Sequence, residues 1–141
     1  MSAAYDWNKL LPDFLGPLRE THGALVASEL EAGLRHLITL RASQINRCAF
    51  CVDMHYREAL ADGDTPERLA KLVVFDRVAD FTPAEKAAIA WTEALTELHL
   101  RPDLPGLRAE LEAHFTEREI GLITAQVAMI NLWNRLMVGR E

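Results

Sequence analysis

Residues 116–138 of this chain are TEREIGLITAQVAMINLWNRLMV, and this stretch decides the fold class. Thr116 and Glu119 have the spacing of a capping box, in which each side chain satisfies a free backbone donor at a helix start. Apolar residues then occur on most sides of the helical repeat, as in a helix buried in a core or a subunit interface. The segment therefore predicts a long helix that reaches about Val138.

The rest of the chain also has helical periodicity and no alternating strand pattern. A second capping box, Thr82 with Glu85, opens another helix. Further helices are expected over 18–29, 34–45 after a break at Gly33, 48–61, from 66 onward, and 107–115. The prediction is a single all-α domain over residues 1–141, with about six to seven helices.

Composition excludes several classes of function. Half of the residues are hydrophobic, the formal charge is −6, and no basic run is present, so nucleic acid is not an expected partner. No apolar run is long enough to span a membrane, and Met1–Lys9 lacks the regions of a signal peptide. The expected location is cytoplasmic, where close thiols are catalytic, redox-sensing or metal-binding rather than structural.

The stretch Cys48-Ala-Phe-Cys51-Val-Asp-Met-His55 holds the only two cysteines, and the histidine follows the second by four residues. On an α-helix these three side chains fall within about 60° of one another, on one face. Two thiols can close a disulfide, and an imidazole can convert one of them to the thiolate. Cys51, one turn from His55, is the candidate nucleophile, and Cys48 near the helix start is the candidate resolving thiol.

Other interpretations of these residues stay open. Cys48, Cys51 and His55, with His36 as a fourth ligand, are a reasonable zinc set, although consecutive ligands on one rigid helix wrap a tetrahedral ion poorly. The cysteines can also be buried simply as small hydrophobic residues. A thioredoxin-type site is excluded because the βαβ pattern that accompanies it is missing.

Residues 37–55, LITLRASQINRCAFCVDMH, together with 90–95 (AWTEAL) and 130–136 (INLWNRL), resemble the carboxymuconolactone decarboxylase superfamily. More narrowly, they are similar to its alkylhydroperoxidase AhpD-like branch, over about residues 34–138. The resemblance implies an all-helical fold that assembles into trimers or hexamers. It also implies a peroxidase or disulfide reductase for small (alkyl) hydroperoxides, with no metal or cofactor and with an external dithiol or lipoyl-type protein as reductant.

The same resemblance assigns roles to residues. Cys51 forms the sulfenic acid, and His55 relays protons. Cys48 first donates a proton and then acts as the resolving thiol. One position departs from the family pattern: the relay glutamate expected twelve residues before the first cysteine is His36. A histidine there can serve as a base but brings no negative charge to His55. A redox-sensing oligomer without turnover is therefore kept as an alternative function.

Some remaining polar residues carry weaker expectations. Arg47 stands where the family frequently has glycine, and it adds a cation next to Cys48. Polar side chains inside the apolar last helix are expected to hydrogen-bond to another helix or subunit, since buried polar groups need partners; they are Asn131, Asn134 and Arg135. Three isolated histidines are expected at the surface or partly packed; they are His22, His99 and His114.

Overall fold

The computed structural model describes residues 4–141 and contains only helices in that range. The elements are α1 (Trp7–Leu10), α2 (Pro12–Val26), α3 (Ala32–Ile45), α4 (Ala49–Ala61), α5 (Pro66–Ala70), η1 (Leu72–Arg77), α6 (Pro83–Thr96), η2 (Leu98–Leu100), α7 (Leu104–Glu112) and α8 (Glu117–Val138). The predicted all-α class is confirmed. Met1–Ala3, on which the expectation about a signal peptide partly rests, lie outside the described residues.

Both predicted capping boxes are present, and they start α6 and α8. The first helices differ from the prediction. α2 begins at Pro12 rather than near residue 18, and it continues through Pro17. A proline inside a helix costs about 3 kcal/mol, but burial of Leu15 and Leu18 against α8 offsets it at about 1.5–3 kcal/mol each. Gly33 marks no break, because it lies in the first turn of α3.

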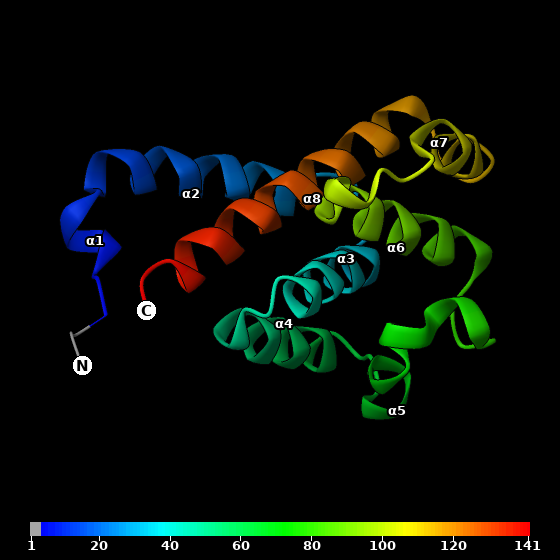
Figure 1. Cartoon of the computed structure of the whole chain (residues 1–141), viewed down its shortest axis with the longest axis horizontal. Coiled ribbons are helices and arrows are strands. Elements are labelled where there is room, and N and C mark those ends of the chain that lie inside the picture. The colour runs from blue at the N-terminus through cyan, green and yellow to red at the C-terminus, as the bar shows by residue number, and fades with distance from the viewer. Residues whose placement is uncertain (1–3) are drawn as a thin grey trace.

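Helix α3 is the centre of the molecule and contacts α4, α6 and α8 (Figure 1). Its residues Leu34 and Ile38 pack with α6, α7 and α8, whereas Leu37 and Leu40 pack with α4, α5, η1 and α6. Both sides of α3 are therefore occupied by hydrophobic clusters. Across residues 4–141, no helix combines the length and apolar character needed to cross a bilayer.

Polar contacts fix the end of α3 against α8. The Nδ2 of Asn46, the C-cap residue of α3, donates to the Oδ1 atoms of Asn131 and Asn134, both at 2.9 Å. Asn134 in turn donates to the Oγ of Ser43 at 3.0 Å. The expected polar network is thus between helices of one chain. It holds the loop before Cys48 in place, because that loop starts at Asn46.

Candidate active site

Helix α4 starts at the cysteine pair. Cys48 is its N-cap, with extended backbone, and its Sγ accepts from the Cys51 N–H at 3.4 Å. The Cys48 N–H donates to the Ser43 carbonyl at 3.1 Å, so α3 holds the cap residue directly. The expected position of Cys48 at the helix start is confirmed. Sulfur thereby takes the role that a serine or aspartate oxygen usually has at an N-cap.

Arg47 connects α3 to this cap in the left-handed conformation, with φ of 56°. A residue without a Cβ adopts this conformation without steric cost, which explains physically why glycine suits the position. The Arg47 side chain is exposed and lines a separate shallow hollow with Ala49 and Tyr56. Its cation is therefore next to Cys48 in sequence but is not part of the cavity that Cys51 faces.

Cys48 and Cys51 are joined by a disulfide, with their Cα atoms 5.3 Å apart. This separation lies in the range that disulfides use. Both residues are buried, at 2% and 1% exposure. The two sulfurs predicted to pair are therefore together, and their cycling between dithiol and disulfide stays a prediction.

A cavity of about 580 Å³ lies among α2, α3, α4 and α8. Cys51 lines it, whereas Cys48 is not among its lining residues. His55 and His36 line it too, so three of the four predicted site residues meet at one space. The remaining lining is Arg19, His22, Val26, Arg35, Thr39, Phe50, Met54, Glu58, Ala61, Asp62, Gln126, Trp133 and Met137. Cys48 lies behind Cys51, at the other end of their bond.

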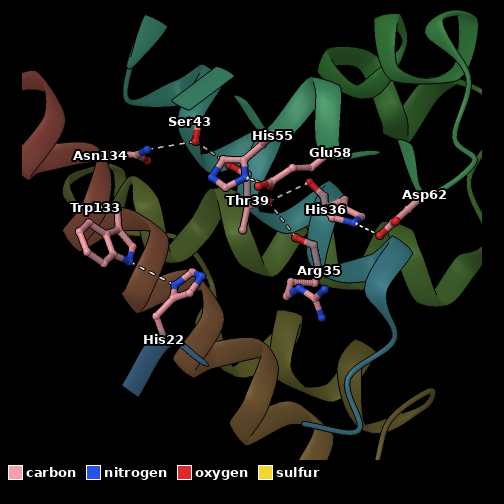
Figure 2. A network of polar contacts seen from close by, with 10 residues as sticks. All are labelled: His22, Arg35, His36, Thr39, Ser43, His55, Glu58, Asp62, Trp133 and Asn134. Atoms are coloured by element: carbon pink, nitrogen blue, oxygen red, sulfur yellow. Dashed lines mark hydrogen bonds and ion pairs between the residues drawn. The ribbon is translucent and has the colours of Figure 1, made fainter. Parts of the chain in front are cut away.

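His55 has a carboxylate partner that was not predicted from the sequence. Its Nδ1 lies 2.8 Å from Oε2 of Glu58, one turn further along α4 (Figure 2). Because an ionised carboxylate only accepts hydrogen bonds, Nδ1 carries the proton and Nε2 is left with the basic lone pair. Burial lowers the pKa of His55, Glu58 opposes this, and His36 and His22 add to the lowering. The imidazole is therefore set up as a neutral base.

His36 has its own acidic partner, because its Nε2 lies 2.6 Å from Oδ2 of Asp62, just after α4 (Figure 2). The sequence predicts that His36, in place of the family glutamate, brings no negative charge to His55. Glu58 supplies that charge instead, from His55's own helix. The spacing from His55 to Glu58 is that of neighbours on a helix face, and this signal was available in the sequence.

His22 is partly packed, as expected, but it belongs to the same cavity. The Nε1–H of Trp133 donates to its Nδ1 at 3.2 Å, which joins α8 to α2 (Figure 2). Burial lowers the pKa of His22, with a smaller contribution in the same direction from Arg35 and an opposing one from Glu58. His22 and Trp133 thus form a wall opposite α4.

The zinc interpretation finds no support in the geometry. Over the described part of the chain, no three His, Cys, Asp or Glu side chains are arranged to hold a metal ion. His55 and His36 instead each contact a carboxylate of their own. The arrangement is that of a disulfide-bonded cysteine pair beside a carboxylate-oriented imidazole.

An all-helical fold that holds a cysteine pair and a nearby histidine is typical of one class of proteins. Sequence comparison assigns the chain to the same class. The chain belongs to the carboxymuconolactone decarboxylase family, whose sequence model matches residues 12–94, from the start of α2 into α6. Among relatives, the uncharacterized protein YdfG of Bacillus subtilis (strain 168) is 28% identical over 138 residues. The match covers 98% of this chain and 94% of YdfG.

Solved structures place the fold in the AhpD-like branch. A protein of unknown function from Agrobacterium tumefaciens, ATU0492, described as a candidate antioxidant defence protein AhpD, superposes with a TM-score of 0.91 at 35% identity. That match covers 99% of this chain and 95% of the other. The debrominase Bmp8, in complex with 2,3,4-tribromopyrrole, shares the fold at 18% identity, with a TM-score of 0.84 and coverage of 94% and 71%. The predicted AhpD-like fold is confirmed.

Proposed function

We propose that the protein is a thiol-dependent oxidoreductase that reduces small organic hydroperoxides through Cys51, Cys48 and His55. The observation that carries the proposal is the division of the cysteine pair. Cys51 lines the cavity together with His55, whereas Cys48 lies behind it and is bonded to it. The nucleophile must contact the substrate, whereas the resolving thiol needs to contact only the nucleophile.

In the reduced enzyme the first step uses Cys51 as a thiolate. The neutral Nε2 of His55 takes the thiol proton, and Glu58 stabilises the resulting imidazolium. The sulfur attacks the terminal peroxide oxygen, so that an S–O bond forms and the O–O bond breaks. The departing alkoxide takes the proton from His55. The products are an alcohol and the sulfenic acid of Cys51.

The second step closes the disulfide. The sulfur of Cys48 attacks the sulfur of Cys51, the S–O bond breaks, and hydroxide leaves as water with the proton of Cys48. The Cα separation of 5.3 Å in the bonded pair supports this step, since it lies in the range that disulfides use.

Turnover then needs two electrons and two protons from outside. An external dithiol, or a lipoyl-type reductant protein, supplies them by thiol–disulfide exchange and is itself left as a disulfide. The chain's own residues supply no other reductant in this scheme, and no bound cofactor is required. Dithiols of this kind are kept reduced in the cytoplasm, the compartment in which we expect the protein to act.

We also propose that the chain forms a homo-oligomer, a trimer or a hexamer. Large apolar side chains exposed on the first two helices and at the residue between them support this, among them Leu10, Leu11 and Phe14. The mass of the native protein in solution, measured by light scattering at several concentrations, tests the proposal. A monomer at all of them would contradict it.

The test of the function is peroxide consumption by pre-reduced protein with dihydrolipoamide in excess. Wild type should consume many equivalents of cumene hydroperoxide, and Cys51→Ser should consume none. Pre-reduced Cys48→Ser, assayed without the dithiol, should consume one equivalent and then stop, because its sulfenic acid has no thiol to condense with. Asp53→Asn is the matched control, since Asp53 is exposed on α4 and outside the cavity, and it should keep the wild-type rate.

The same experiment separates the alternatives. A wild-type protein that consumes one equivalent and forms its disulfide, but is not reduced again by the dithiol, is the redox sensor rather than the enzyme. Consumption by Cys51→Ser equal to that of wild type would remove the proposed nucleophile altogether.

A further inference from the structure

Gln126 is a buried amide with nothing to bind. It lies on α8, is 1% exposed, and within the described residues neither its Nε2 nor its Oε1 has a hydrogen-bond partner. An amide that is left unpaired after burial destabilises the folded state, so such groups usually have partners. Its situation therefore needs an explanation.

Other buried polar side chains of the described chain are satisfied. Asn134, two turns further along α8, binds Asn46 and Ser43, and Thr92 donates to a backbone carbonyl. The buried histidines of the site each contact a carboxylate. Gln126 is the exception, and it is also the buried uncharged amide that lines the cavity of Cys51.

The cavity around Gln126 is built for an organic molecule. Its apolar lining comes from Val26, Phe50, Met54, Trp133 and Met137. Its volume of about 580 Å³ lies in the range of small-molecule sites. Hydrogen peroxide fills about the space of two water molecules, roughly 60 Å³, and would leave most of the cavity empty.

We propose that Gln126 is a specificity-determining residue, which holds an uncharged hydroxyl or hydroperoxide group of an otherwise apolar ligand in this cavity. Both amide atoms are closed to solvent as the side chain lies here, so the amide must turn toward the cavity when the ligand binds. The bound group then donates to Oε1 and accepts from Nε2, so both unpaired atoms are satisfied at once. A carboxylate only accepts and an ammonium only donates, and either would leave one amide atom unpaired. The inference rests on the proposed function for the reacting end of the substrate, but the binding preference stands without turnover.

Equilibrium binding to the oxidised wild-type protein tests the inference, because the disulfide form cannot consume a ligand. The probes are cumyl alcohol and tert-butylbenzene, which have nearly the same shape and differ by a hydroxyl in place of a methyl group. Tryptophan fluorescence reports binding, since Trp133 lines the cavity. Gln126→Met keeps the length of the side chain and removes both polar atoms.

The expected result is that Gln126→Met weakens cumyl alcohol binding about tenfold, the effect of losing hydrogen bonds to a neutral group. Its affinity for tert-butylbenzene should change less than twofold. Gln44→Met is the control, because Gln44 is the other glutamine of the chain and is outside the cavity. It should leave both affinities unchanged.

Three results would overturn the inference: equal losses for the two probes, no loss for either, or no binding of cumyl alcohol to wild type. Thermal unfolding without ligand is the second measurement, and Gln126→Met should raise Tm because the unpaired amide is removed. A lower Tm would mean that Gln126 has a structural partner. If peroxide turnover is absent while cumyl alcohol binds as described, the proposed function fails and this inference stands.

Discussion

The substitution Glu58→Gln tests how the site activates its nucleophile. It removes the negative charge next to His55 but keeps an oxygen that can accept from Nδ1–H. His55 should therefore keep its orientation and lose the stabilisation of its protonated form. Since Glu58 raises the pKa of His55 against the effect of burial, the substitution should lower that pKa further.

The size of the effect follows from the geometry. The contact is 2.8 Å, with the His55 side chain 7% and the Glu58 side chain 49% exposed. An exposed ion pair contributes about 0.2–1 kcal/mol and a hydrogen bond to a charged group about 1.5–3 kcal/mol. A half-exposed carboxylate on a buried imidazole falls between these, at about 1.4 kcal/mol, which is about tenfold in kcat/KM.

The assay is kcat/KM for cumene hydroperoxide with a dithiol donor, measured from about pH 5 to about pH 9. Its acid limb reports the protonation of the free enzyme's base, and in Glu58→Gln this limb should move to lower pH. Asp53→Asn removes a carboxylate from the same helix outside the cavity and should change neither rate nor pH profile. The reasoning is refuted if Glu58→Gln stays within twofold of wild type and its acid limb does not move.

Three further predictions concern stability. Arg47→Gly should raise the free energy of unfolding by up to about 1 kcal/mol in urea titrations, because glycine removes the steric strain of the left-handed conformation at φ 56°. The greater chain entropy of glycine in the unfolded state offsets part of this stabilisation. A destabilised variant would show that Arg47 has a stabilising contact. Asn134→Ala should cost about 2–3 kcal/mol in the same titrations, since it leaves Asn46 and Ser43 without their buried partner; a loss below 0.5 kcal/mol, on the order of a surface change, would contradict the network. Burial lowers the folded-state pKa of His55 below its unfolded value of about 6.5. The neutral imidazole therefore contributes to the free energy of unfolding above that pH, and the contribution is lost as the pH falls toward the folded pKa. The decrease in unfolding free energy of the oxidised protein between about pH 7.5 and about pH 5.5 should therefore be smaller in His55→Gln, and an equal decrease would contradict the burial effect.

Local features of the fold could be predicted from the sequence. The capping boxes at Thr82 and Thr116 and the helix start at Cys48 depend on residues three positions apart, and all are present. The start of α2 could not be predicted in this way. Pro17 locally favours a break, and only the burial of Leu15 and Leu18 against α8 makes the longer helix stable.

The residues of the site also fall into two groups, those that local sequence patterns predict and those that they do not. Cys51 and His55 share a helix, so their common orientation followed from helical spacing, and the same rule applied to Glu58 would have found its carboxylate. His22 and Trp133 are 111 residues apart in the chain. The contact between them, and the position of Gln126 at the cavity, depend on how α2 and α8 pack against α3 and α4. Local sequence patterns do not determine this packing.

The central claim is that Cys51, and not Cys48, meets the oxidant. The most direct measurement is trapping of sulfenic acid with dimedone during treatment of reduced single variants with cumene hydroperoxide, followed by peptide mass spectrometry. We predict a dimedone adduct on Cys51 in Cys48→Ser and no adduct on Cys48 in Cys51→Ser. An adduct on Cys48 that forms at least as fast as the one on Cys51 would contradict the account.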